Sequence, residues 1–481
     1  SAERVGDQNV WETKITSLLA SEPKLETDPV QKITYQINPK AVWSDGVEIT
    51  GADFVYTWDQ IANGEDVYDR SGYKDVESVT VDPADDHKVV VTMAKNYAGW
   101  KDLFGGNYGV LPSHILEGKD RNAEMKDGYT FSGGPFKLEA WNKGESIVLV
   151  PNEKYWGDKP VLDKVTFAIQ ADTVAEFKSF NAGEVSAIYP QPQIAVIDSI
   201  NSGLKDAKRI VNKDTASTEA IWINNEAAPF DSLKVRQAFG YSLDRDVIVN
   251  ALFGDIGITK AVNSFVAPAL KQYADEVGFA DYKLDVKKAS DLLEEDGWKK
   301  GSDGVYAKDG KKLEFTLNST EGNERRKLMM ENIQKQLQDA GWLVTIAPVP
   351  AGDLFGDLAP SGNFQAAIYA QVLTTLNPTN CNLFCLAQIP SDENDNSGQN
   401  WTRTRNDDAD EQLQLVDSEL DDANRIKASK AAEKFLAQEA TSFPLDPLPN
   451  ILIWKTNVVG GIDENPIQGP FWTLNKWGLK K

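Results

Sequence analysis

The sequence predicts an α/β protein that divides into two or three domains. Its 481 residues, of which 41% are hydrophobic and 10% aromatic, are too many for a single hydrophobic core. Apolar residues alternate at 313–317 and again at 344–346, and a helix is predicted between these two strands at 325–340. Such a strand–helix–strand unit builds a parallel sheet. An earlier predicted helix, 286–295, ends in Gly-Trp as this one does, and each glycine suits a left-handed cap.

The charge and hydropathy of the chain exclude several kinds of partner. With a formal net charge of -23, the chain lacks the excess of Lys and Arg that binding to nucleic acid or to an anionic membrane surface requires. No apolar run reaches the roughly 20 residues that cross a bilayer, and the first four residues lack the apolar core of a signal peptide. We interpret the acidity as a solvated, self-repelling exterior, which suits an exported protein.

No motif of a known catalytic or cofactor site stands out. The sequence has no Gly-x-x-x-x-Gly-Lys phosphate loop, no Gly-x-Ser-x-Gly elbow and no His-Glu-x-x-His zinc motif. His87 and His114, the two histidines, lack ligand-like neighbours, so we expect no metal and no cofactor. The 73 Asp and Glu residues offer many pairs for glycoside hydrolysis, but none is distinguished. Binding without catalysis is the prediction, and a secreted carboxylate-dependent glycosidase is the alternative from a different class.

Residues 38–58 combine a turn, a helix start and an aromatic helix face. The alternating residues 33–37 before them predict a half-buried strand, and Asp45-Gly46 supplies a tight turn. Thr50 can then cap a helix. The first turn and the apolar face of this helix would carry Asp53, Phe54, Trp58 and Ile61.

Two later segments also join several local signals in order. In residues 131–156, Gly-Gly-Pro precedes two alternating strands, 136–141 and 146–150, which are joined as a hairpin. In residues 218–248, a strand leads to an Asn-Asn pair and then to a helix that Asp231 or Ser232 caps.

The final third is predicted to contain a strand at 364–372, a long charged helix at 408–439 and a last strand at 448–459. Cys381 and Cys385, the two cysteines, lie in the loop that follows the first of these strands. We favour a local disulfide that closes this loop. Two reduced, buried thiols are the alternative.

Together, the segments 38–58, 131–156 and 218–248 resemble the family 5 extracytoplasmic solute-binding proteins. These are the ligand-capturing subunits of ABC importers for oligopeptides, dipeptides, nickel and some oligosaccharides. The resemblance implies a periplasmic-binding-protein-like α/β fold of two hinge-linked lobes with an additional domain and the ligand in the cleft. It predicts lobe one at residues 1–12, 129–216 and 453–481, the extra domain at 13–128, and lobe two at 217–452.

The resemblance also suggests which residues face the ligand. It places some candidates on the segment that leads to the cleft and on the strand that crosses between lobes. It places the others on the strand 364–372 and after the polar stretch that follows this strand. Aromatic and amide side chains there suit either peptide backbones or sugar rings. For the two tryptophans a place in the core is the alternative. The candidate ligand-binding residues are Tyr189, Gln191, Trp222, Asn224, Tyr369, Gln371, Thr374 and Trp401.

One departure from the family pattern concerns the charge of the ligand. In the peptide receptors, the strand resembling 364–372 runs into an aspartate that pairs with the α-ammonium of the peptide, and the matching position here is Thr374. A threonine cannot balance a charge, so a free-amine peptide would need another carboxylate, or the ligand is neutral. We place peptides first, oligosaccharides second and metal chelates third.

The resemblance further implies an exported receptor, in the periplasm or on the outer face of the cytoplasmic membrane, which works with ABC permease subunits. A monomer is expected. The family normally has a longer N-terminal passage before the equivalent of residues 18–20, so ligand contacts from that passage, and a lipid anchor on it, cannot be assigned to residues of this sequence.

Overall fold

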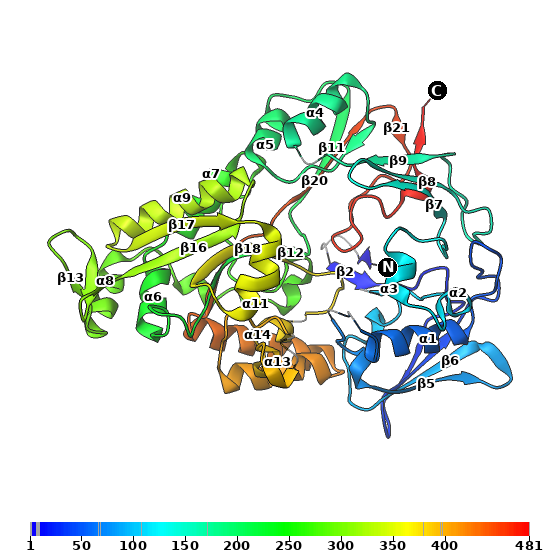
Figure 1. Cartoon of the computed structure of the whole chain (residues 1–481), viewed down its shortest axis with the longest axis horizontal. Coiled ribbons are helices and arrows are strands. Elements are labelled where there is room, and N and C mark those ends of the chain that lie inside the picture. The colour runs from blue at the N-terminus through cyan, green and yellow to red at the C-terminus, as the bar shows by residue number, and fades with distance from the viewer. Residues whose placement is uncertain are drawn as a thin grey trace.

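The computed structural model describes residues 2–5, 10–65, 67, 69–106, 108–170, 172–378, 380–394, 396 and 398–480. The chain forms three bodies (Figure 1). The extra domain contains the N-terminal strands and helices in blue, and lobe two contains the green to orange middle of the chain. Lobe one combines cyan and green segments with the red C-terminal chain. The predicted two-lobed α/β fold with an additional domain is therefore confirmed.

The extra domain is an antiparallel sheet covered by the helix that the sequence predicted after Thr50. Helix α1 (Gly51–Ala62) buries Phe54 and Ile61 against the sheet. The Asp53 carboxylate accepts hydrogen bonds from the Thr50 N–H at 3.1 Å and from the indole N–H of Trp43 at 3.2 Å. The motif thus ties the helix start to the preceding turn. The sheet order is β3 (Lys24–Glu26), β4 (Lys32–Gln36), β6 (Asp85–Met93) and β5 (Val76–Asp82).

Lobe one is assembled from distant parts of the chain. The predicted hairpin at 136–150 is confirmed as the first two strands of an antiparallel sheet. A second sheet places a strand from the end of the chain between two earlier ones. The predicted boundary 452/453 falls inside that strand, β20. The elements are β7 (Phe136–Asn142), β8 (Ser146–Pro151) and β9 (Val165–Ala168), then β10 (Ala187–Ile188), β20 (Asn450–Lys455) and β11 (Ala207–Asn212), with α4 (Thr173–Ala182) and α5 (Ile194–Asn201).

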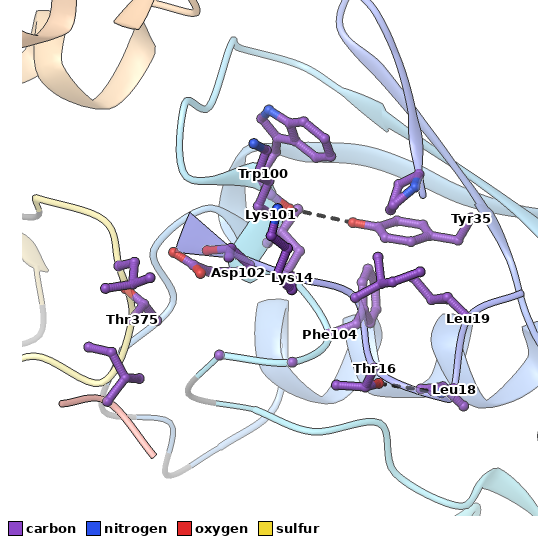
Figure 2. Close-up of a pocket in the computed structure, with 18 of the residues that line it drawn as sticks. Lys14, Thr16, Leu18, Leu19, Tyr35, Trp100, Lys101, Asp102, Phe104 and Thr375 are labelled. Atoms are coloured by element: carbon purple, nitrogen blue, oxygen red, sulfur yellow. Dashed lines mark hydrogen bonds between the residues drawn. The ribbon is translucent and has the colours of Figure 1, made fainter. Parts of the chain in front are cut away.

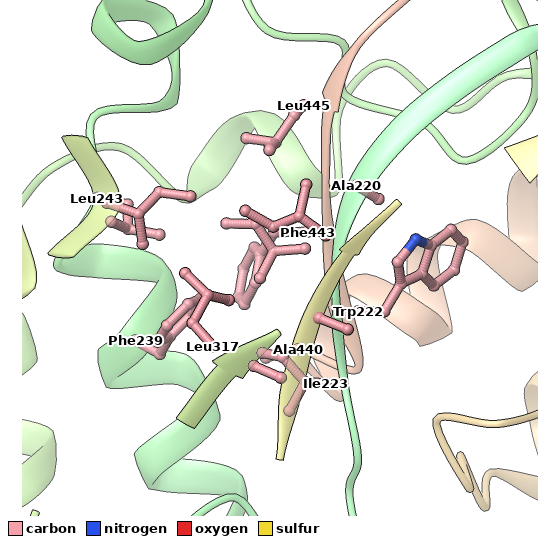
Figure 3. Packing of buried hydrophobic residues seen from close by; sticks show 14 of the residues in the cluster. Ala220, Trp222, Ile223, Phe239, Leu243, Leu317, Ala440, Phe443 and Leu445 are labelled. Atoms are coloured by element: carbon pink, nitrogen blue, oxygen red, sulfur yellow. The ribbon is translucent and has the colours of Figure 1, made fainter. Parts of the chain in front are cut away.

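Lobe two is built on a five-stranded mixed sheet that is buried on both faces. The predicted strand–helix–strand unit is present, with its two strands paired in parallel. Figure 3 shows Phe239 and Phe443 on one side of the inner strand β12 and Trp222 on the other. The sheet order is β17 (Leu343–Val349), β16 (Glu314–Thr320), β18 (Ala366–Val372), β12 (Ser217–Ile223) and β19 (Ser442–Asp446). The main helices are α6 (Leu233–Tyr241), α7 (Arg245–Phe253), α8 (Val286–Glu295) and α9 (Glu324–Asp339).

The prediction of a single charged helix at 408–439 is wrong in one respect, because the segment forms two helices. Helix α13 (Asp407–Ser418) ends where Glu419 adopts extended backbone angles, and α14 (Asp422–Gln438) then begins. The Asp421 side chain accepts a hydrogen bond from the Asn424 N–H at 2.9 Å and so caps the new helix. This break lets the two helices fold back and pack on each other. None of the described helices combines the length and the apolar character that a membrane crossing requires.

Short elements complete the described part of the chain. The predicted disulfide between Cys381 and Cys385 is confirmed and spans a single helical turn. The helical elements are α2 (Ser113–Leu116), α3 (Arg121–Met125), α10 (Ala351–Asp353), α11 (Ala359–Ser361) and α12 (Cys381–Phe384). The strands are β1 (Ala2–Val5), β2 (Val10–Thr13), β13 (Lys299–Lys300), β14 (Tyr306–Lys308), β15 (Lys311–Lys312), β21 (Val458–Val459) and β22 (Gly478–Leu479).

Candidate functional site

A cavity of about 410 Å³ opens where the extra domain, the loop after β18 and the C-terminal chain meet. This volume is in the range that ligand sites occupy. Its walls combine apolar and aromatic side chains with polar and charged ones. The apolar lining includes Ile15, Leu18, Leu19, Tyr35, Phe54, Trp100 and Phe104, and the polar lining includes Lys14, Thr16, Glu22, Lys101, Asp102, Thr374, Thr375 and Gln468. Figure 2 labels ten of these residues.

Residues 97–106 carry the part of the cavity wall that the extra domain contributes. Gln31 holds the start of this segment, because its amide donates to the Tyr97 carbonyl at 3.0 Å and accepts from the Tyr97 N–H at 2.7 Å. The Phe104 N–H donates to the Tyr73 hydroxyl at 2.6 Å, and the Phe104 ring packs on Phe54 with centroids 4.8 Å apart. The segment is therefore anchored at both ends in the core of the extra domain.

Lobe two presents the opposite wall on residues 373–377, and the two segments approach closely. A Cβ at Gly106 would lie 2.7 Å from the Thr375 methyl carbon, and one at Gly99 would lie 2.5 Å from Asn377 Nδ2. A side chain at either position would have to displace these neighbours. Asn377 is itself held, because its oxygen accepts a hydrogen bond of 2.5 Å from the guanidinium of Arg425.

Asp102 lies between these segments, at the end of the 3₁₀ turn Trp100–Asp102. Burial raises the pKa of its carboxyl to about 6, and a hydrogen bond from the Thr375 side chain opposes part of the rise. The group is therefore mainly ionised at pH 7. In Figure 2, the Asp102 and Thr375 side chains lie close to each other.

A second, smaller cavity of about 110 Å³ adjoins the first between the extra domain and lobe two. The two cavities share Asp102, Leu103, Thr374 and Thr375, so they form one interrupted cleft. The second cavity is the more polar of the two. Its other lining residues include Asp69, Ser71, Tyr73, Tyr97, Tyr108, Gln371, Asn382 and Gln399.

The structure places two of the eight predicted ligand-binding residues on these walls. Gln371 lines the smaller cavity, and Thr374 lines both. Trp222 and Tyr369 instead stack in the core of lobe two with ring centroids 5.1 Å apart, and Trp401 packs against Tyr369 at 6.0 Å. Burial on both faces of the sheet explains why alternation along β12 did not direct Trp222 toward the cleft.

The other three predicted residues lie outside the two cavities. The buried Asn224 amide donates to the carbonyls of Gly362 at 2.9 Å and Phe364 at 3.1 Å, which fixes the start of β18. Tyr189, 36% exposed, packs edge-on against Phe471 in lobe one, and Gln191 is exposed nearby. Whether these residues contact a ligand stays a prediction.

Sequence reasoning missed the contribution of the extra domain and of the segment that leads into it. It assigned binding to the lobes, whereas residues 100–106 and 13–23 form much of the larger cavity. The run Trp100 to Gly106, with two aromatic residues, two charges and two adjacent glycines, was a usable signal. A close approach of two backbones is one reason for such glycines.

Among the described residues, one group has the spacing of metal ligands, namely Asp85, Asp86 and His87. It lies on β6 and lines neither cavity. His87 Nδ1 is 2.7 Å from an Asp86 oxygen, so the imidazole already has a partner within the group.

Comparisons with known proteins agree with this architecture. The oligopeptide-binding protein AppA of Bacillus subtilis is 27% identical over 447 residues, which cover 91% of this chain and 79% of the relative. The solved structure of Bacillus subtilis AppA in complex with a nonapeptide has a TM-score of 0.82, with 25% identity over 96% of this chain and 90% of that one. NikZ of Campylobacter jejuni in complex with Ni(L-His) has a TM-score of 0.81, with 22% identity over 96% of this chain and 90% of that one, and shows the fold alone.

The family model described as "Bacterial extracellular solute-binding proteins, family 5 Middle" matches residues 14–385. The matched region includes residues 14–128 of the extra domain, all of the first two sequence motifs and strand β12. It extends over well more than half of the 481 residues. The chain therefore belongs to the family 5 bacterial extracellular solute-binding proteins.

Proposed function

We propose that this protein captures a peptide in the cleft between the extra domain and lobe two and delivers it to the permease of an ABC importer. One observation carries the proposal: all three bodies of the molecule border the larger cavity, whose walls combine apolar and aromatic side chains with polar and charged ones. A site of this kind can bury the side chains of a peptide while a small number of polar groups orient it.

As a family member, the chain is an exported solute-binding receptor of an ABC importer. Its finer placement, in the periplasm or on the outer face of the cytoplasmic membrane, belongs to the proposal. So do action as a monomer and attachment through a lipid anchor. The comparisons support a peptide as the solute, because AppA of Bacillus subtilis is named for binding oligopeptides.

Oligosaccharides and metal chelates, the other ligands considered for this fold, are less well supported. Aromatic walls suit sugar rings, but the charged side chains Lys14, Lys101 and Asp102 give the cleft ionic character that a neutral sugar would not use. Neither His87 nor His114 lines either cavity. A chelate that needs an imidazole ligand therefore has none from these two residues.

We also propose that the protein binds without turnover. The relatives are binding proteins, and the charged groups of the cleft suit ligand orientation. A screen with chromogenic glycosides and peptides tests this. Turnover that disappears when one cleft carboxylate is replaced would contradict it.

The peptide assignment is tested by thermal shift and native mass spectrometry with pools of random pentapeptides, maltooligosaccharides and nickel–histidine. At 100 times its dissociation constant, a ligand stabilises the protein by about 2.7 kcal/mol, which raises the melting temperature. We expect a shift with the peptide pool. A shift with the sugars or the chelate and none with peptides would contradict the proposal.

A variant that fills the larger cavity locates the site. Gly105 lines this cavity, and a Cβ there meets nothing within 4 Å, so Gly105→Phe adds a ring without a clash at its base. The peptide-induced shift should be lost. Gly352→Phe is the matched control, because Gly352 is equally open but lies outside both cavities, and it should leave the shift unchanged.

A further inference from the structure

We propose that a third cavity, apart from the peptide cleft, binds a small amphipathic carboxylate, with the anionic group on Arg121 and the apolar body against aromatic side chains. The cavity measures about 500 Å³, within the range of ligand sites. Its lining comes mainly from the end of α1, from α3 and from the segments 108–111 and 129–133. It shares Tyr108 with the smaller cleft cavity and no described lining residue with the larger one. The site is therefore independent of the proposed function.

Aromatic rings dominate the apolar part of this third cavity. Trp43, Tyr108, Tyr129 and Phe131 all line it. The Phe131 ring packs edge-on against Trp43 with centroids 5.8 Å apart, and the Tyr129 ring lies 6.0 Å from Phe131. Tyr129 is nevertheless 56% exposed beside this apolar surface. An apolar ligand body that covered these rings would gain free energy in proportion to the area removed from water.

Several of these rings are held in place by contacts within the protein. The Trp43 indole N–H donates a hydrogen bond to the Asp53 carboxylate at 3.2 Å, and Phe131 packs on that indole. The Tyr108 hydroxyl donates to the main-chain carbonyl of Asp69 at 2.7 Å. A wall fixed in this way loses little conformational freedom when a ligand binds.

Arg121 supplies the charge of the cavity. Its half-buried guanidinium donates to the main-chain carbonyls of Gln60 at 3.1 Å and Glu65 at 2.9 Å, which also caps the end of α1. It donates twice more to Asn122 Oδ1, each time at 3.2 Å. These four bonds leave one of its five N–H groups for a ligand.

The positive charge of Arg121 has no anionic partner in the described part of the chain. Its hydrogen-bond acceptors are neutral oxygens, and none of the described carboxylates forms an ion pair with it. The described lining of the cavity also contains no Asp or Glu. In a chain with a net charge of -23, this is a local site for an anion.

A carboxylate with an apolar body matches both features of the cavity. Its anionic group would form a charge-assisted hydrogen bond with Arg121, which is stronger than the bonds of the guanidinium to neutral oxygens. A neutral amphiphile would gain only the burial of its apolar body. A cationic one would meet the guanidinium as a like charge, which is unfavourable.

The test compares octanoate with octanol, which has the same apolar chain without the charge, by isothermal titration calorimetry on the full chain. We expect one octanoate to bind, roughly 10- to 100-fold more tightly than octanol, the range expected for hydrogen bonds to charged groups. Arg121→Gln should reduce this preference to near unity. Lys126→Gln, which neutralises an exposed cation at the end of α3 outside the three cavities, should keep it.

A second variant locates the site without touching Arg121, and it serves if Arg121→Gln does not fold. Gly109 lines the third cavity, and a Cβ there meets nothing within 4 Å, so Gly109→Phe adds a ring that should abolish octanoate binding. Gly352→Phe, at an equally open glycine outside all three cavities, should leave octanoate binding unchanged.

Three results would overturn the proposal. Equal affinities for octanoate and octanol, or a preference that survives in Arg121→Gln, would remove the role of the guanidinium. Octanoate binding that is abolished in Gly105→Phe but kept in Gly109→Phe would place the carboxylate in the peptide cleft instead. Absence of saturable octanoate binding would remove the third site and leave the capture of peptides unaffected.

Discussion

Burial changes the ionisation of several carboxyl groups in this fold. Burial raises the pKa of Asp417 to about 7 and that of Glu433 to about 7. Glu433 is supported by hydrogen bonds from the Ser264 hydroxyl and from backbone N–H groups, whereas one oxygen of Asp417 has no described hydrogen-bond partner. Both acids therefore prefer the protonated state in the folded protein more than in the unfolded chain.

Asp417 should make the protein less stable as the pH rises. Its folded pKa of about 7 lies above the ordinary value of 3.8, so the stability that it contributes is complete below pH 4 and is lost as the pH rises through 7. Asp417→Asn removes this titration. We expect the drop in melting temperature between pH 5 and pH 8 to be smaller in the variant, as measured by differential scanning calorimetry.

The control for this prediction is Asp408→Asn, an exposed change on the same helix. It should leave the pH dependence of the melting temperature as it is in the unaltered protein. If the melting temperature of Asp417→Asn falls as far between pH 5 and pH 8 as that of the control, burial of Asp417 does not cause the pH dependence.

At the scale of elements, local chemistry accounts for most boundaries. The hairpin at 136–150 and the helix after Thr50 were predictable because their turn and cap residues act within a few positions of the chain. The α13–α14 break was missed because Asp421 is one acid in an acidic run, and its capping role depends on the extended backbone at Glu419. The packing of α13 on α14 stabilises the conformation in which the chain turns between the two helices.

Loss of the Asp421 cap should destabilise the α13–α14 pair. Asp421→Ala leaves the Asn424 N–H without its side-chain acceptor, and the expected cost is about 1 kcal/mol. Urea denaturation monitored by circular dichroism measures it. Lys430→Ala, an exposed change in the middle of α14, is the comparison and should cost far less.

At the scale of the molecule, charges cluster where lobe two connects to lobe one. Glu219 on β12 pairs with Arg325 and Arg326 at the start of α9, and Asp446 on β19 lies opposite Glu219 in the sheet. Although burial opposes it, the two guanidinium groups hold the pKa of Glu219 below its ordinary value. Burial and the nearby Glu219 raise the pKa of Asp446 to about 8.

This cluster should contribute strongly to the stability of lobe two. Arg325→Met would leave Glu219 buried with a single cation, and removal of one partner from a buried ion pair costs about 3–5 kcal/mol. The urea midpoint followed by tryptophan fluorescence measures the change. Lys327→Met alters an exposed cation on the same helix and should have little effect, so equal losses in the two variants would refute the argument.

The candidate site was less predictable than the fold. Of the predicted ligand-binding residues, Gln371 near the end of β18 and Thr374 in the loop after it reach the cleft. Trp222 and Tyr369 stack in the core instead. A sheet buried on both faces gives apolar residues on either side, so alternation cannot say which face meets a ligand. Asp102 is one of 73 acidic residues, and no sequence pattern distinguished it from the others.

By itself, the sequence determined the α/β class, the order of the main elements, the local disulfide and the family, because caps, turns and alternation act between near neighbours. Only the tertiary structure decided which segments enclose the cleft. Residues 97–106 and 373–377 are far apart in the chain and meet through packing of the extra domain against lobe two. Asp102, whose pKa burial raises, lies between these two segments, and no local pattern encodes that position.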